Sequence, residues 1–206
     1  MIGIFGGTFD PVHYGHLRAA LEAKEYFGLD EIRLIPSAKP PHRDTPQVPA
    51  AMRLDMLKLA IEHQPGFIAD NREIERTGAS YMVVTLESLR SEFPGKSLLL
   101  FIGTDAFNNL ASWYQWEKLF DLAHVVVLTR PNSLVKPLDK FYAEKQTQQT
   151  RQLREQLAGK LYFQAITQLD ISATAIRTLI AQGKNPRYLL PDAVITYINE
   201  HRLYKS

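Results

Sequence analysis

Short apolar runs alternate with amphipathic stretches along most of the chain, and this alternation is the strongest constraint on its fold. The apolar runs have the length of strands: Ile2–Phe5, Ile32–Ile35, Phe67–Ala69, Leu98–Ile102, Val125–Leu128 and Tyr162–Ile166. Helical patterns lie between them, at Leu17–Phe27, Ala51–Ile61, Tyr81–Phe93, Glu117–Leu122 and Leu153–Leu157. Apolar strands that alternate with helices predict an α/β fold, a doubly wound parallel sheet with helices on both faces.

Composition and charge narrow the functions that the chain can have. The 206 residues contain no cysteine, so disulfides, thiolate nucleophiles and cysteine-ligated zinc are excluded. A net charge of +2 is too small to indicate a nucleic-acid surface, and no apolar run approaches the roughly 20 residues of a membrane span. Because the sequence shows no signal peptide, we expect a cytoplasmic protein. Its length predicts one domain, 1–206, with a small helical part at about 171–206.

A glycine-rich turn follows the first predicted strand. Its sequence is Gly6-Gly7-Thr8-Phe9-Asp10-Pro11-Val12-His13-Tyr14-Gly15-His16. Such a turn points backbone N–H groups at an anion and lets the anion approach the main chain closely. His13 and His16 lie where the turn becomes a helix, and imidazolium groups there can donate to phosphoryl oxygens. The segment predicts phosphate chemistry, with a structural histidine cap or a metal site as the alternatives.

A second candidate segment lies near the other end of the chain. Its sequence is Asp170-Ile171-Ser172-Ala173-Thr174-Ala175-Ile176-Arg177. Ser172 or Thr174 is a good helix cap, and the simplest interpretation is a capped helix with an exposed arginine. The alternative is a second helix N-terminus that offers N–H groups, hydroxyls and the Arg177 guanidinium to a polyphosphate.

Further candidates follow the predicted strands, and ligands of parallel sheets bind beyond the carboxyl ends of the strands. The loop Pro36–Pro49 holds five prolines and cannot be helical throughout. The candidates are Lys39, His42 and Arg43 in this loop, Asp105, the aromatic pair Trp113 and Tyr114, and Arg130. The glutamine-rich residues 132–152 are typical of a solvated helix or a loose insertion.

Together the two segments resemble the paired signatures of the nucleotidyltransferase superfamily that carries a His-x-Gly-His motif. The closer resemblance is to the bacterial nicotinate mononucleotide adenylyltransferases. Further segments that resemble this family are spread over nearly the whole chain: Lys39–Arg43, Ser80-Tyr81, Gly103–Asp105, Trp113-Tyr114, Arg130-Pro131 and Tyr188–Pro191.

The resemblance implies a Rossmann-like fold and the transfer of an adenylyl group from ATP to nicotinate mononucleotide. Mg²⁺ is expected to arrive with ATP, without metal ligands from the protein. The catalytic residues implied are His16, His13, Arg177 and Lys39. The implied ATP site consists of Gly6, Gly7, Thr8, Phe9, His13, His16, Asp105, Ile171, Ser172, Thr174 and Arg177. The implied mononucleotide site consists of Lys39, His42, Arg43, Tyr81, Met82, Trp113, Tyr114 and Arg130.

In such a site Trp113 is expected to stack on the pyridine ring, and backbone N–H groups near Met82 and Tyr114 to hold its carboxylate. Met82 stands where the family usually has threonine, and Val84 where it has a polar residue. The alternative acceptors are therefore nicotinamide mononucleotide and phosphopantetheine. From other classes, a nucleotide-binding sensor without activity and, more weakly, an RNA-binding protein are the alternatives. We expect no nucleic-acid or membrane partner, and a homo-oligomer is compatible with the sequence.

Overall fold

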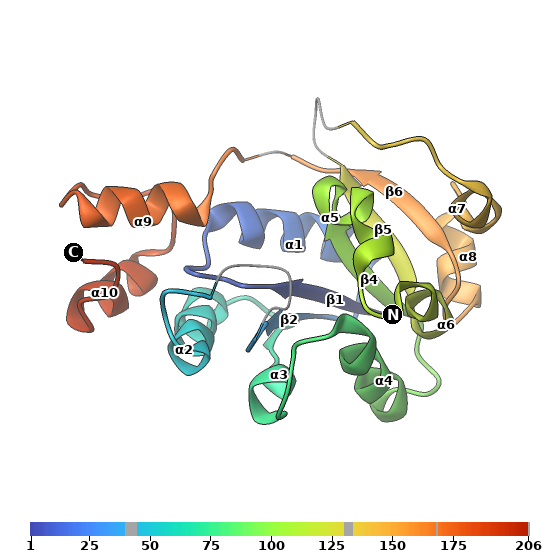
Figure 1. Ribbon diagram of the computed structural model, residues 1–206, viewed down its shortest axis with the longest axis horizontal. Coiled ribbons are helices and arrows are strands. Elements are labelled where there is room, and N and C mark those ends of the chain that lie inside the picture. Colours follow the sequence, from blue (N-terminus) through green and yellow to red (C-terminus); the bar gives the residue numbers. More distant parts are fainter. Residues whose placement is uncertain (40–44, 130–133, 168, 206) are drawn as a thin grey trace.

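One parallel sheet organises the part of the chain that the structure describes, residues 1–39, 45–129, 134–167 and 169–205 of a computed structural model. Its strands are β1 (Ile2–Gly7), β2 (Glu31–Pro36), β3 (Phe67–Ala69), β4 (Leu98–Gly103), β5 (His124–Thr129) and β6 (Leu161–Ala165). Their order is β3-β2-β1-β4-β5-β6, and all pairs are parallel (Figure 1). The predicted doubly wound fold is confirmed. Its topological switch point lies between β1 and β4.

Helices connect the strands, as the alternation of patterns predicted. They are α1 (Tyr14–Phe27), α2 (Ala50–Ile61), α3 (Arg72–Glu75), α4 (Met82–Glu92), α5 (Thr104–Asn108), α6 (Leu119–Leu122), α7 (Lys140–Lys145), α8 (Thr150–Glu155), α9 (Ala173–Ala181) and α10 (Asp192–Glu200), with 3-10 turns η1 (Leu110–Ser112) and η2 (Trp116–Lys118). The helix predicted at Glu117–Leu122 is divided between η2 and α6. The one predicted at Leu153–Leu157 lies earlier, as α8, and the strand predicted at Tyr162–Ile166 begins and ends one residue earlier, as β6.

The sheet has a hydrophobic core on each face, because successive residues of a strand point to opposite sides. In β4, Leu99 and Phe101 belong to the first core, whereas Leu98, Leu100 and Ile102 belong to the second. Residues of α1, α2, α8, α9 and α10 complete the first core, and residues of α4, α5, α6 and α7 complete the second. Strands covered on both faces explain why the sequence shows continuous apolar runs.

The C-terminal helical part extends the first core. α9 contributes Ile176 and Ile180, and α10 contributes Val194 and Ile198. The hydroxyl of Ser172 accepts a hydrogen bond from the Ala175 N–H at 3.1 Å, so Ser172 caps α9 as predicted. Figure 1 shows α9 and α10 at the end of the molecule opposite the N-terminus.

Within the predicted segment 132–152, the described residues from 134 onward pack in part against the sheet, unlike the expected solvated helix or loose insertion. α7 lies in this segment, and Tyr142 is buried in the second core. Its ring centroid lies 5.1 Å from that of Phe107 and 5.3 Å from that of Trp116. The helix is one of the two expected outcomes, but its burial was not expected, because only Phe141 and Tyr142 of α7 are large apolar residues.

Candidate active site

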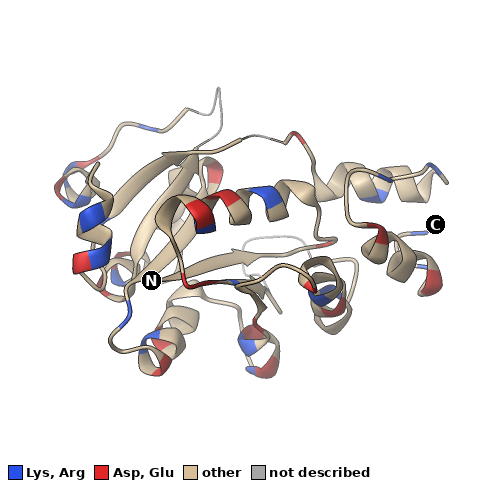
Figure 2. Ribbon diagram, turned by 180° about the vertical axis from the view of Figure 1, so that it is seen from behind, with Lys and Arg blue, Asp and Glu red and all other residues tan. Residues whose placement is uncertain are grey.

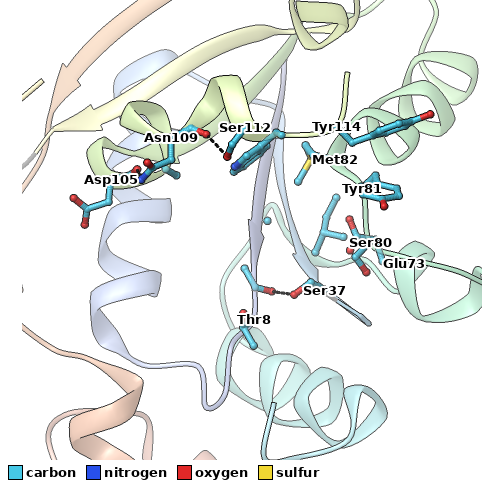
Figure 3. Close-up of a pocket in the computed structure, with 15 residues that line it drawn as sticks. Thr8, Ser37, Glu73, Ser80, Tyr81, Met82, Asp105, Asn109, Ser112 and Tyr114 are labelled. Carbon is cyan, nitrogen blue, oxygen red and sulfur yellow. Dashed lines mark hydrogen bonds between the residues drawn. The ribbon is translucent and has the colours of Figure 1, made fainter. Parts of the chain in front are cut away.

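A cavity of about 460 Å³ opens where β1, β2 and β4 end, beside the switch point between β1 and β4 (Figure 3). This volume is in the range of small-molecule sites. The lining includes predicted residues of the ATP site, Gly6, Gly7, Thr8 and Asp105, and of the mononucleotide site, Tyr81, Met82, Trp113 and Tyr114. It also includes Ile35, Ser37, Glu73, Ser80, Ala106, Asn109 and Ser112, which the sequence analysis did not select. Part of each predicted site therefore lies in this cavity, whereas seven residues of the predicted ATP site are not among its lining residues: Phe9, His13, His16, Ile171, Ser172, Thr174 and Arg177.

The turn after β1 is packed so closely that it leaves no room for a side chain at position 7, where the sequence has glycine. A Cβ atom at Gly7 would lie 2.9 Å from the ring of Phe9. Phe9 is 1% exposed and has a φ of 49°, a left-handed conformation that is rare for residues other than glycine. The buried Phe9 ring thus holds the backbone of the turn against the first core, while Gly6 to Thr8 line the cavity.

The two histidines of the first signature stack on each other where α1 begins. Their ring centroids are 3.7 Å apart and their planes differ by 25°. The ring of Phe9 meets His16 edge-on, with centroids 5.0 Å apart. His13 is buried and is the N-cap residue of α1, whereas His16 is half-buried. The stack fixes both imidazoles at the positive end of the α1 dipole, where an anion is favoured.

The second signature meets the first at this point. Nη1 of Arg177 donates to the main-chain oxygen of Asp10 at 2.7 Å, and Nη2 donates to Oγ1 of Thr174 at 3.3 Å. A Cβ atom at Gly15 would lie 3.4 Å from the carbonyl oxygen of Ile171. Arg177 is half-buried rather than exposed. The beginnings of α1 and α9 are thus neighbours, although the sequence separates Asp10 and Arg177 by 167 positions.

Aromatic rings line the other side of the cavity. The ring centroids of Tyr81 and Tyr114 are 4.6 Å apart, and Figure 3 shows Met82 beside this pair. Trp113 is half-buried and packs against the second core. α4 begins at Met82, and the first N–H groups of a helix have no acceptor within the helix. The beginning of α4 therefore offers N–H donors and the positive end of a dipole to an anionic group.

Of the predicted cations, Lys39 lies at the rim of this cavity. Its N–H donates to Oγ of Ser80 at 3.0 Å, and the Ser80 N–H donates to the Lys39 carbonyl at 3.0 Å. Ser80 itself lines the cavity, so this pair of bonds fixes the position of the Lys39 backbone. The predicted residues His42, Arg43 and Arg130 lie outside the described residues.

Arg53 lies beneath the glycine-rich turn and was not predicted from the sequence. Its side chain is 1% exposed, and its Nη1 donates to the Thr8 carbonyl. Nη2 donates to the Ser37 carbonyl at 2.6 Å, and Nε donates to the Val48 carbonyl at 3.0 Å. Burial holds the pKa of the guanidinium below its ordinary value, although the nearby Asp10 carboxylate acts in the opposite direction. Arg53 thus joins the turn to both ends of the proline-rich loop.

Glu73 is a carboxylate in the cavity lining that was likewise not predicted from the sequence. It is 3% exposed, and its Oε1 accepts a hydrogen bond from Oγ1 of the buried Thr85 at 2.6 Å. Figure 3 shows Glu73 next to Ser80. The bond ties α3 to α4 and so supports the position of Tyr81 at the beginning of α4. A single acidic residue in a polar segment gives no sequence signal for such a role.

Three further observations concern metals, membranes and charge. The described residues contain no group of three or more His, Asp or Glu side chains that could hold a metal ion. No helix in the same part of the chain has the length and apolar character needed to cross a membrane. Figure 2 shows basic and acidic residues interspersed over the described ribbon, rather than the stripe of basic residues typical of a nucleic-acid surface.

Comparisons with known proteins identify the family to which the chain belongs. The family described as cytidylyltransferase-like matches residues 4–179. A protein of Pseudomonas putida named "Probable nicotinate-nucleotide adenylyltransferase" is 48% identical over 210 residues, which cover 100% of this chain and 90% of the relative. A protein of Methylococcus capsulatus with the same name is 47% identical over 99% of both chains. The chain belongs to the nicotinate-nucleotide adenylyltransferase family.

Solved structures of other proteins have the same fold as this member of the nicotinate-nucleotide adenylyltransferase family. The Plasmodium falciparum nicotinic acid mononucleotide adenylyltransferase complexed with NaAD has a TM-score of 0.75, with 18% identity over 98% of this chain and 96% of that chain. The same enzyme complexed with APC has a TM-score of 0.72 at 16% identity, over 98% of this chain and 96% of that chain. The likeness supports the Rossmann-like architecture that the sequence resemblance implied.

Proposed function

We propose that this protein transfers the adenylyl group of ATP to nicotinate mononucleotide, which gives nicotinate adenine dinucleotide and pyrophosphate in NAD biosynthesis. One observation carries this function: the two signature segments meet where α1 and α9 begin, through the bond between Arg177 and Asp10, and Gly6–Thr8 of the first segment line the neighbouring cavity. The relatives that share 47% to 48% of their residues with the whole chain are named for the same activity.

In this proposal the ATP phosphates lie between the beginnings of α1 and α9. The backbone of Gly6–Thr8 and the imidazoles of His13 and His16 contact them from one side. Thr174 and Arg177 contact them from the other side, with the N–H groups of the capped helix α9. Two helix N-termini that point at one anion add their dipoles, so a polyphosphate is the ligand that this arrangement favours most.

The chemistry requires no covalent nucleophile from the protein. The phosphate of nicotinate mononucleotide is already an anion, and one of its oxygens attacks the α-phosphorus of ATP in line. As the new P–O bond forms, the bond to pyrophosphate breaks, and pyrophosphate leaves with its electron pair. The protein positions two anions that repel each other and neutralises their charge. His16 donates to the phosphoryl oxygens, and Lys39 and Arg177 supply positive charge.

Mg²⁺ fits this site as a partner of the ATP phosphates. Among the described residues, Asp105 and Glu73 are the carboxylates of the cavity lining, and Glu73 already accepts from Thr85. Asp105 is exposed and is the carboxylate available to the hydration shell of the ion. When bound, the ion neutralises phosphate charge; the protein residues keep the roles given above.

The beginning of α4 favours the acid over the amide. A carboxylate gains from unpartnered N–H groups and from the positive end of the helix dipole, whereas a neutral carboxamide gains less. The backbone N–H of Met82 is at the beginning of this helix. The Met82 side chain packs against Gly6: a Cβ atom added at Gly6 would lie 2.6 Å from Cε of Met82. Because the donor belongs to the backbone, methionine in place of threonine leaves the selectivity for nicotinate mononucleotide intact.

The decisive experiment measures pyrophosphate release from ATP and Mg²⁺ with nicotinate mononucleotide and nicotinamide mononucleotide in parallel. We expect a strong preference for the acid, and a kcat in His16→Ala that is lower by about 10²-fold or more, as for the loss of a transition-state donor. His63→Ala is the matched control, since the side chain of His63 is 93% exposed. Near-normal turnover of His16→Ala would contradict its role. Absence of release with both acceptors, despite ATP binding by the wild type, would refute the function.

A further inference from the structure

Asp10 joins the glycine-rich turn to the last residues of the chain. It is 5% exposed, and each of its carboxylate oxygens has a donor. Oδ1 accepts from the hydroxyl of Tyr204 at 2.6 Å, and Oδ2 accepts from the Gln47 N–H at 2.9 Å. Its main-chain oxygen accepts from Arg177. One buried residue thus connects the turn, the proline-rich loop, α9 and the C-terminal end.

The chain end follows a strained path to make this contact. Arg202 has a φ of 54° and Tyr204 a φ of 60°, in the left-handed region that residues with side chains rarely adopt. These two residues turn the chain after α10, so that Leu203 and Tyr204 pack against the first core. The bond to Asp10 and the packing of the ring are the contacts that compensate for this strain.

The polar cluster around Asp10 keeps the Tyr204 hydroxyl as a donor. Burial raises the pKa of Tyr204 far above its ordinary value, and the hydrogen bond to Asp10 raises it further. The positive charges of Arg177 and Arg53 act in the opposite direction without outweighing burial. At neutral pH the hydroxyl is therefore protonated, and the carboxylate of Asp10 balances the buried guanidinium beneath the turn.

We propose that Tyr204 is a positioning residue of the ATP site, which acts through Asp10 on the glycine-rich turn and on Arg177. The inference rests on the proposed function, since it assumes that the ATP phosphates lie at this turn. Without the hydroxyl, Oδ1 of Asp10 is a buried carboxylate oxygen that has lost its donor. Asp10 then shifts or admits water, and the acceptor of Arg177 shifts with it.

The mononucleotide half of the cavity provides an internal reference. In the described part of the chain, two hydrogen bonds hold this half in place: one from the Lys39 N–H to Ser80, and one from Thr85 to Glu73. These bonds join α3, α4 and the beginning of the proline-rich loop at Lys39, whereas Asp10 contacts the same loop near its other end, at Gln47. A change at Tyr204 should therefore weaken the binding of ATP and spare the binding of nicotinate mononucleotide.

The test compares Tyr204→Phe with Tyr197→Phe in the full chain. Tyr197 is a matched control, because its hydroxyl also donates to a carboxylate, Asp55 of α2, at 3.2 Å, away from the turn. Titration calorimetry with an α,β-methylene analogue of ATP gives the Kd without turnover. In Tyr204→Phe we expect this Kd and the KM for ATP to rise about tenfold, as for a lost hydrogen bond to a charged group. In Tyr204→Phe the KM for nicotinate mononucleotide should stay within about twofold of the wild type. In Tyr197→Phe the Kd of the analogue and the KM for ATP should also stay within about twofold.

Thermal midpoints of both variants are recorded, and binding is measured well below the lower one, so that unfolding is not mistaken for lost affinity. A Kd of Tyr204→Phe within about twofold of the wild type overturns the inference. An equal rise in KM for both substrates overturns it too, because it indicates a general loss of structure. Failure of the wild type to bind the analogue would instead refute the proposed function.

Discussion

At the scale of single residues, His124 shows how hydrogen bonds fix a protonation state. It is fully buried, and its Nε2 lies 2.9 Å from the Gln156 carbonyl oxygen, while its Nδ1 accepts from the Lys160 N–H at 3.0 Å. This arrangement requires the neutral ring with the proton on Nε2. Burial disfavours the charged form of the ring, and a second proton on Nδ1 would face the N–H of Lys160, so the pKa of His124 is lowered.

The lowered pKa of His124 predicts a loss of stability in acid. Above the ordinary histidine pKa of about 6.5 the ring is neutral in both folded and unfolded chains, and its contribution is fully present. As the pH falls below that value only the unfolded chain takes up the proton, so stability falls by up to about 1.4 kcal/mol per pH unit until the folded pKa is reached. We expect the difference in unfolding free energy between wild type and His124→Gln to shrink from pH 7.5 to pH 5.5 in urea titrations. An equal change of unfolding free energy with pH in the wild type and in His124→Gln would contradict this prediction.

At the scale of the elements, a network of ion pairs holds α3 in place. Arg72 donates to Asp70 and to Glu92, each at 2.8 Å, and Arg33 of β2 donates to Asp70 at 2.9 Å. Burial alone would raise the pKa of Asp70, but the bonds from Arg72 and Arg33 outweigh burial and hold it below its ordinary range. The network positions the short helix that carries Glu73 into the cavity lining.

Removing the central carboxylate of this network should loosen α3. Asp70→Asn leaves Arg33 and Arg72 together without their buried counter-charge, and we expect a loss of about 3 kcal/mol in unfolding free energy. Because α3 supports α4 through Glu73, the KM for nicotinate mononucleotide should rise more than the KM for ATP. Glu92→Gln is the control, since the Glu92 side chain is 46% exposed and such pairs contribute about 1 kcal/mol or less. Equal losses in the two variants by urea unfolding would disprove the central role of Asp70.

The elements also show what the sequence could predict. The strands were found because buried parallel strands are continuous apolar runs. α1 begins at Tyr14, before the predicted start at Leu17, because its cap is His13 rather than a usual capping residue. The signature segments were found from local patterns. Arg53 was missed because its three carbonyl acceptors come from distant parts of the chain and meet only in the folded sheet.

At the scale of the whole molecule, the first core joins the sheet to the C-terminal helical part. Leu34 of β2 and Met56 of α2 belong to the same cluster as Val194 and Ile198 of α10. The hydrogen bonds of Arg177 and Tyr204 to Asp10 join the same two parts on the polar side. A helical part that shares its core with the sheet has no core of its own, so it should fold only with the rest of the chain.

This shared core predicts one cooperative unfolding transition for residues 1–206. Tryptophan fluorescence reports on the second core through Trp113 and Trp116, whereas circular dichroism at 222 nm reports on all helices, and the two thermal curves should coincide. Ile198→Ala creates a cavity in the first core and should cost roughly 2–5 kcal/mol, so that both curves move to lower temperature together. Asn199→Ala, on the exposed side of α10, should leave both unchanged. A loss of helix signal that precedes the fluorescence change in Ile198→Ala would show instead that the C-terminal part unfolds as a separate unit.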